Sequence, residues 1–89
     1  MYFVRLGGDE FAIIAVDANY ERFVTLLDNI RVVISSYKLK NEDEDVGISI
    51  SLGVVNSKKA KSKKFETLYK KADVKLYEAK EKGKNIVVQ

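Results

Sequence analysis

Cysteine, histidine, proline and tryptophan are all absent from the 89 residues of this chain. Without cysteine and histidine, the chain has no disulfide, no thiol nucleophile, no Cys/His zinc site and no imidazole group for acid–base catalysis. Carboxylates, lysines, hydroxyls and backbone amides are therefore the groups left for chemistry.

Long apolar runs are missing too. No stretch approaches the roughly 18 residues that a spanning helix needs, and no charged-then-apolar leader precedes a small-residue cleavage site. We therefore expect a soluble, cytoplasmic segment without membrane contact. The length allows one small domain with a modest core. The lack of proline, of a Gly/Ser-rich linker and of internal repeats argues against a second domain.

The formal charge of +3 is unevenly distributed. Residues 56–84 hold eleven lysines against four acids, a local charge of +7, which leaves −4 for the remainder. An acidic run at 42–45 and a basic run at 58–64 both interrupt the hydrophobic periodicity, and we interpret them as solvated loops. The alternative for the basic run is a rim that attracts a triphosphate or a nucleic acid.

Hydrophobic patterning predicts an α+β fold, a sheet with helices on one side. Asp17 or Asn19 can cap the first helix, and Gly83 suits a left-handed end to the second. The predicted elements are strands at 2–6 and 11–16, a helix at 19–37, a strand at 46–55, a helix at 64–82 and a strand at 85–88.

Two of these elements are patterned strongly enough to predict which face is buried. The strand at 46–55 alternates an apolar face with a face of small and polar residues, which permits close approach of another layer or of a ligand. The first helix is expected to pack on the sheet through residues spaced by four and three. These residues are Phe23, Leu27, Ile30, Ile34 and Tyr37.

The most informative segment lies between the first two predicted strands, at Arg5-Leu6-Gly7-Gly8-Asp9-Glu10-Phe11. Glycine lets another molecule approach the backbone and leaves amide groups free to face an anion such as phosphate. Two carboxylates beside phosphate require a cation between them, and hard oxygen ligands suit Mg²⁺. The segment therefore indicates metal-assisted chemistry on a nucleotide.

Gly7-Gly8-Asp9-Glu10-Phe11, preceded by Arg5, resembles the signature of the GGDEF family, the diguanylate cyclases. A second segment resembles the same family and follows in the expected order. It comprises Ala72-Asp73, Leu76-Tyr77, Ala79-Lys80 and Gly83-Lys84-Asn85. The strand-like run at 49–54 also lies where the family has a serine-containing strand that ends in glycine. The resemblance covers almost the whole chain.

The resemblance implies a ferredoxin-like sheet similar to the palm of nucleotide cyclases and polymerases. It implies an enzyme that condenses two GTP molecules into cyclic di-GMP, with release of pyrophosphate, for bacterial second-messenger signalling. Each protein domain would supply half of the site, so an antiparallel homodimer would be the catalytic unit. The resemblance also implies an upstream sensory or receiver domain in the parent protein.

The matching positions assign roles to individual residues. Asp9 stands where the family binds Mg²⁺ or Mn²⁺ and accepts a proton, and Glu10 beside it supports the metal. Gly7 and Gly8 let the backbone of the turn come close to the nucleotide.

Lys80 and Lys84 match the two basic positions that hold the triphosphate. The second position is commonly arginine, and lysine keeps the charge but loses the bidentate fork. A simpler explanation also exists for both lysines, because the helix dipole favours cations near a helix C-terminus.

The chain resembles only the C-terminal part of the family domain. Before the hairpin, the family has a strand and two helices that carry a further metal-binding aspartate and the Asn and Asp that recognise guanine. The family also has an inhibitory site that binds the product through an Arg-x-x-Asp motif, which would end at the position of Met1. We therefore expect the fragment alone to be inactive. Because the family's first strand lies centrally in the sheet, we also expect unpaired strand edges and dimerisation or element swapping.

Two alternatives remain at this point. One is a degenerate, non-catalytic GGDEF module that binds nucleotide or a protein partner. The other is a small basic α+β domain that binds nucleic acid. The latter would need aromatic residues for base stacking on its central strand, and residues 46–55 contain none, so no nucleic-acid partner is expected.

Overall fold

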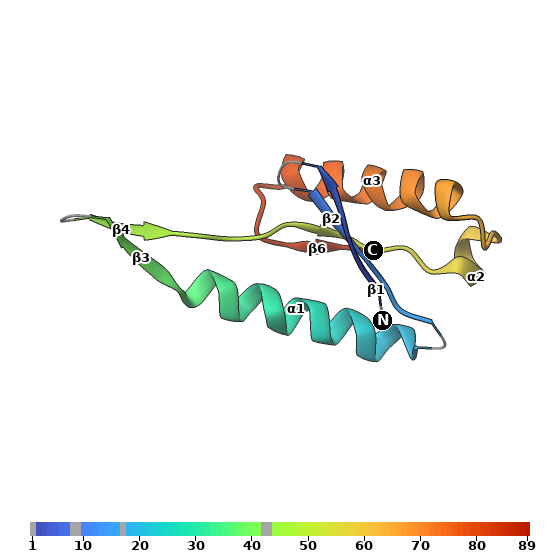
Figure 1. The fold of residues 1–89 in the computed structure, drawn as a ribbon, viewed down its shortest axis with the longest axis horizontal. Coiled ribbons are helices and arrows are strands. Elements are labelled where there is room, and N and C mark those ends of the chain that lie inside the picture. The colour runs from blue at the N-terminus through green and yellow to red at the C-terminus, as the bar shows by residue number, and fades with distance from the viewer. Residues whose placement is uncertain (1, 8–9, 17, 42–43) are drawn as a thin grey trace.

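The described strands of this chain are short, and each pairs with one other strand. The computed structural model describes residues 2–7, 10–16, 18–41 and 44–89. The chain contains both helices and strands, which confirms the mixed α and β composition (Figure 1). The elements are β1 (Tyr2–Gly7), β2 (Glu10–Ile14), α1 (Tyr20–Ser36), β3 (Lys38–Asn41), β4 (Glu44–Gly47), β5 (Leu52–Gly53), α2 (Ser57–Ala60), α3 (Phe65–Glu81) and β6 (Val87–Val88).

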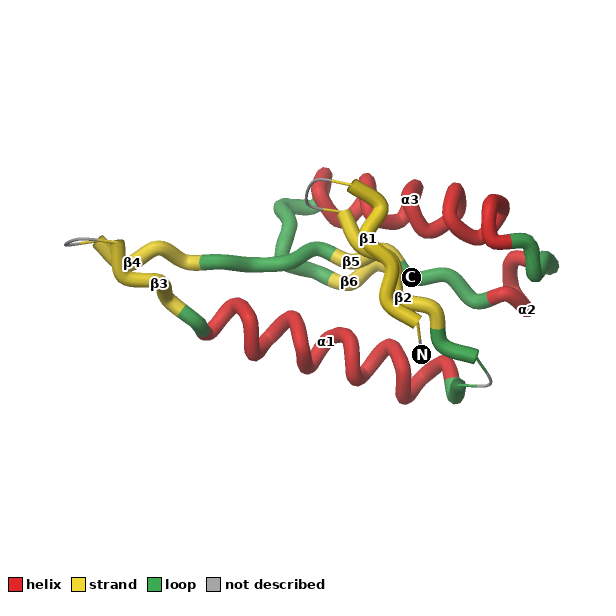
Figure 2. The backbone as a smooth tube through the Cα atoms, in the orientation of Figure 1, coloured by secondary structure: helices red, strands yellow, loops and turns green. Residues whose placement is uncertain are grey.

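The described strands form three separate two-stranded sheets. β1 pairs antiparallel with β2 from Tyr2↔Ile14 to Gly7↔Glu10, with a shift of register before Gly7. β3 and β4 form a second antiparallel hairpin, and β5 pairs parallel with β6. Figure 2 shows the β3–β4 pair at one end of the molecule, away from the other two pairs. Since these strands do not join into one sheet, the palm-like sheet stays a prediction.

The single strand expected at 46–55 is instead divided. β4 pairs with β3 at one end, β5 pairs with β6 at the other, and residues 48–51 between them lie outside both ladders. The alternation of residue types carries no information about which strand lies alongside, so it could not predict this division.

Parts of the two charged runs have regular structure where loops were expected. Glu44 and Asp45 belong to β4, whereas residues 42 and 43 lie outside the described residues. The basic run contains α2. Asn56 caps this helix by accepting a hydrogen bond from the backbone N–H of Lys58 at 2.8 Å, and the left-handed Lys61 ends it. These local hydrogen bonds explain a helical turn that apolar periodicity does not reveal.

Helix α1 begins after Asn19, which is one of the two residues predicted to cap it. The Asn19 side chain accepts a hydrogen bond from the backbone N–H of Arg22 at 3.0 Å. The predicted apolar stripe is only partly buried, because Leu27 is 5% exposed whereas Ile30 and Tyr37 are 39% and 61% exposed. The two-stranded β5–β6 sheet is too narrow to cover the whole apolar surface of a 17-residue helix.

The molecule is elongated, with dimensions of 50 × 23 × 23 Å. Its radius of gyration of 14.3 Å exceeds the value of about 12 Å typical of a compact domain of this length. Four hydrophobic residues are buried among those that the structure describes, and they come from four different segments. They are Leu27, Val54, Ala79 and Val88.

Helix α3 packs on β5 at Gly53. A Cβ atom added there would overlap the backbone of Ala72 and Leu76 and lie 2.9 Å from the carbonyl carbon of Lys75. The absence of a side chain therefore lets helix and strand backbones approach directly, as the small-residue face of this segment predicted.

Replacing Gly53 with alanine should lower the free energy of unfolding by about 2–4 kcal/mol, because neither backbone can move without disturbing the other. Urea unfolding followed by circular dichroism measures the change. Gly47→Ala is the matched control, since its Cβ meets nothing within 4 Å, and it should change stability by less than about 0.5 kcal/mol. Equal effects of the two substitutions would contradict close packing at Gly53.

Candidate functional site

The glycine and acidic motif lies at the turn between β1 and β2. Gly7 is the last residue of β1 and pairs with Glu10, the first residue of β2. Gly8 and Asp9, which the sequence assigns to the nucleotide and the metal, lie outside the described residues. Glu10 is half-buried at the start of its strand. Among the described residues of the motif, the structure thus pairs Gly7 with Glu10 across two adjacent antiparallel strands.

The donor types in this turn suit a hard divalent cation, because carboxylate oxygens are the ligands that Mg²⁺ prefers. In the part of the chain that the structure describes, no group of three or more acidic side chains is close enough together to hold a metal ion. Glu10 is the only one of the two predicted metal ligands within that part. The metal assignment therefore rests on residue chemistry and the motif.

The second group of candidate residues lies at the C-terminal end of α3. Lys80 is exposed in the last turn of the helix. Gly83 follows with φ of 106°, which confirms the left-handed end predicted there. The backbone N–H of Gly83 donates to the carbonyl of Lys80 at 3.3 Å, and that of Lys84 donates to the carbonyl of Ala79 at 3.0 Å. These bonds satisfy carbonyls that a helix end otherwise leaves free.

Lys84 itself has a backbone conformation that is unusual for lysine. Its φ is 65°, and the φ of the next residue, Asn85, is 51°. Asparagine tolerates the left-handed region, whereas most other non-glycine residues pay about 1–2 kcal/mol to enter it. The exposed side chain of Lys84 is therefore presented by a loop whose geometry needs support from its neighbours.

That support includes residues to which the sequence alone assigned no role. The Arg31 side chain on α1 donates from Nη1 to the backbone oxygen and to Oδ1 of Asn85, both at 3.1 Å. Its Nε donates to Oδ1 of Asp28 at 2.8 Å. On the other side of the loop, the backbone N–H of Asn85 donates to Oγ of Ser51 at 3.0 Å. The spacing of Asp28 and Arg31 can be recognised in the sequence as that of a helical ion pair. Nothing in the sequence indicates that Arg31 also bonds to Asn85, 54 positions away.

The two groups of candidate residues are only partly brought together. Lys80 and Lys84 share one end of α3, and Figure 1 shows the β1–β2 strand pair running toward that same end of the helix. Among the described residues, no ion pair joins Glu10 to either lysine. The hairpin strands contact each other far more than they contact any other element.

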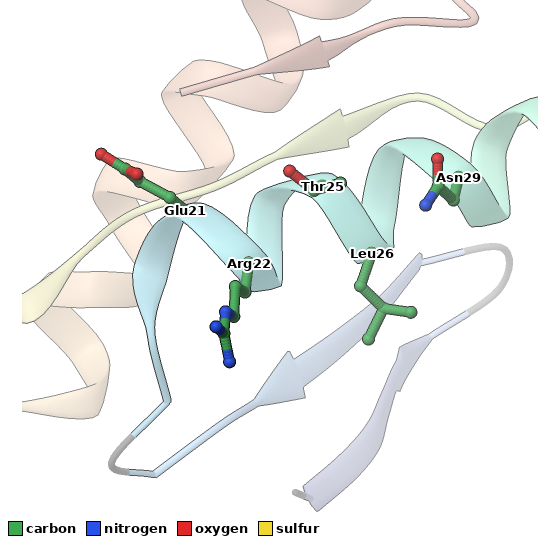
Figure 3. Close-up of a pocket in the computed structure, with 5 residues that line it drawn as sticks. All are labelled: Glu21, Arg22, Thr25, Leu26 and Asn29. Carbon is green, nitrogen blue, oxygen red and sulfur yellow. The ribbon is translucent and has the colours of Figure 1, made fainter.

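A shallow hollow of about 380 Å³ lies along α1, away from these residues. Figure 3 shows Arg22 and Leu26 extending from the helix toward the hairpin. Glu21, Thr25 and Asn29 complete the lining. None of the residues assigned by the motifs lines this hollow, so it is separate from the candidate site.

One lysine of the basic run packs on an aromatic ring. The Nζ atom of Lys59 lies 5.4 Å from the centre of the Tyr20 ring, within cation–π range. Burial raises the pKa of Tyr20 above its usual value. The contact joins α2 to the first turn of α1. The neighbouring lysines of the run, including Lys58 and Lys61, are exposed as expected for a solvated segment.

No helix in the described portion is both long and apolar enough to cross a membrane.

The chain is similar to known proteins over nearly its whole length. Residues 1–86 match the family described as diguanylate cyclase, GGDEF domain. The chain is 34% identical over 87 residues to diguanylate cyclase DosC of Escherichia coli (strain K12), covering 97% of this chain and 18% of that protein. It is 39% identical over 89 residues to signaling protein YkoW of Bacillus subtilis (strain 168), covering 94% and 10%.

A third relative is the probable diguanylate cyclase DgcT of Escherichia coli (strain K12). It is 35% identical over 86 residues, covering 94% of this chain and 19% of the relative. The chain thus spans about a fifth or less of the length of these relatives. The family match over residues 1–86, together with the glycine and acidic turn and the lysines at the end of α3, shows that the chain belongs to the GGDEF family.

Proposed function

We propose that this chain supplies the glycine turn and the phosphate-holding lysines of a diguanylate cyclase half-site. The observation that carries the proposal is the Gly7↔Glu10 pairing, because these two residues flank Gly8 and Asp9 in the motif and are partners in an antiparallel strand pair. A turn of this kind presents backbone and carboxylates at an accessible edge. The family membership supplies the reaction: two GTP molecules are condensed into cyclic di-GMP.

In this reaction the 3′-hydroxyl of each GTP attacks the α-phosphorus of the other. A phosphodiester bond forms, and the bond from the α-phosphorus to the pyrophosphate leaving group breaks. The hydroxyl proton is taken up by Asp9. When bound, Mg²⁺ or Mn²⁺ held by Asp9 and Glu10 makes the hydroxyl more acidic and offsets phosphate charge.

The remaining residues bind and orient the nucleotide. Gly7 and Gly8 carry no side chain that would block close approach of the phosphates to the turn. Lys80 and Lys84 contribute two positive charges at one end of α3 for the triphosphate. Since lysine is a flexible point charge, these contacts hold the anion without the fixed geometry that arginine would impose.

The reaction joins two nucleotides, so two half-sites must face each other, and we propose a homodimer as the assembly. Every described strand has one paired edge and one edge free of any β-ladder. Several large apolar side chains on α1, among them Leu26 and Val33, are exposed as well. We further propose that the chain acts in the cytoplasm under the control of a sensory or receiver domain.

The first test is Mg²⁺-dependent GTP binding, measured by isothermal titration calorimetry. Asp9→Asn and Glu10→Gln should each weaken GTP binding about tenfold in Mg²⁺, because each removes a metal-binding charge. In EDTA the same variants should bind GTP at least as tightly as the unchanged chain, since a negative charge beside phosphate has been removed.

Glu21→Gln is the control, because it removes an exposed carboxylate on α1. An equal loss of GTP affinity in Mg²⁺ and in EDTA would contradict the metal role of the turn. The chain alone should yield no cyclic di-GMP from GTP and Mg²⁺. Product that disappeared in Asp9→Ala would instead show that this chain is catalytic by itself.

The lysines can be tested separately. Lys80→Ala and Lys84→Ala should each reduce GTP affinity about three- to tenfold, and the reduction should shrink as salt is raised, because exposed charge contacts are screened. Lys71→Ala removes the same charge from an exposed position about 13 Å along α3 from Lys80 and should have little effect. Equal effects of all three substitutions would indicate a diffuse basic field without a phosphate site.

The assembly is tested by light scattering coupled to size-exclusion chromatography. We expect the mass of a dimer, because strand edges and apolar helix surface remain available for a second copy. A compact monomer with well-dispersed amide signals would contradict this expectation.

A further inference from the structure

We infer that Asp28, Arg31, Ser51 and Asn85 form a positioning network that holds the loop at Gly83–Asn85 and thereby sets where Lys84 is presented relative to Lys80. This inference rests on the proposed role of the two lysines in holding a triphosphate. It assigns the conformation of the phosphate-holding loop to a residue on a different helix, α1.

The loop has a conformation that would not persist unaided. Gly83, Lys84 and Asn85 have consecutive positive φ angles of 106°, 65° and 51°. Glycine adopts such angles without cost and asparagine tolerates them, but lysine does not favour them. Backbone held in a disfavoured region persists only where its surroundings impose it, and such positions cluster at functional sites.

The backbone amides of this loop are already occupied. The N–H groups of Gly83 and Lys84 donate to the carbonyls of Lys80 and Ala79, and the N–H of Asn85 donates to Ser51 Oγ. The loop therefore cannot bind an anion through a nest of free amides. A phosphate at this end of α3 must be held by side chains, of which Lys80 and Lys84 are exposed cations.

Arg31 braces the loop from α1. Its Nη1 contacts both oxygens of Asn85 at 3.1 Å, so the side chain and the backbone of Asn85 are fixed together. Asp28 accepts from Nε at 2.8 Å and orients the guanidinium of Arg31, whose side chain is only 19% exposed. Because Ser51 engages Asn85 from the strand side, the residue next to Lys84 is held from two directions.

A double-mutant cycle tests whether Arg31 acts through Lys84. The probe is inorganic tripolyphosphate, with binding measured by calorimetry on the 89-residue chain. Arg31→Lys keeps the positive charge but loses the planar guanidinium that donates hydrogen bonds in a fixed geometry. We expect this substitution to weaken tripolyphosphate binding about three- to tenfold. In the Lys84→Ala background the same substitution should have almost no further effect, because the residue it positions is gone.

Two further variants separate positioning from general stability. Ser51→Ala removes the brace on the other side of the loop and should behave like Arg31→Lys, whereas Arg22→Lys, an exposed arginine on the same helix, should leave binding unchanged. Hydrogen exchange at the Lys84 and Asn85 amides should quicken in Arg31→Lys and Ser51→Ala but not in Arg22→Lys.

The outcomes distinguish this inference from the proposed function. If the unchanged chain binds tripolyphosphate and Arg31→Lys has no effect, or weakens binding equally with and without Lys84, the positioning role is wrong while the phosphate site stands. If the unchanged chain does not bind tripolyphosphate or GTP with Mg²⁺, the phosphate site and the inference built on it are both wrong. If Arg31→Lys weakens tripolyphosphate binding only when Lys84 is present, and amide exchange in the loop becomes faster, the phosphate site and the positioning role are both supported.

Discussion

The rest of the structure depends on the direct contact between the backbones of α3 and β5 at Gly53. Only the absence of a side chain allows the carbonyl and amide groups of α3 near Ala72 and Leu76 to lie against the strand. Ala79 of α3 is completely buried, and Val54, Val88 and Leu27 are the other buried hydrophobic residues of the small core. Much of the remaining apolar surface of α1 stays exposed, because a two-stranded sheet offers little area to cover it.

This contact also decides where the basic end of α3 lies. With the helix seated on β5 and β6, the chain must reverse between Glu81 and Val87, and a left-handed loop makes that reversal. Arg31 and Ser51 reach the loop from α1 and from the segment before β5, so three distant parts of the sequence meet at Asn85. Lys84 is therefore presented by a loop that tertiary contacts hold, although it looks like an ordinary helix-terminal lysine in the sequence.

The hairpin that carries the glycine and acidic motif stands apart from this unit. Its strands pair with each other, and they make few contacts with the helices. The two parts of the proposed site thus belong to separate structural units of the chain, one at the hairpin turn and one at the end of α3.

The kinds of element were readable from the sequence, because periodicity, capping residues and short motifs act over a few positions. Asn19 as a cap, Gly83 as a left-handed end and the reversal at Gly7–Glu10 are all local features of this type. Strand partners were not readable: the run at 46–55 is divided between two sheets, and Ile30 and Tyr37 face solvent despite their helical spacing. The sequence by itself determined the family, the turn and the charges, whereas the tertiary structure decided the division of the strand, the limited burial of α1 and the bracing of Asn85 by Arg31. The physical reason is that pairing and burial depend on which surfaces meet, and that choice is made between residues far apart in the chain.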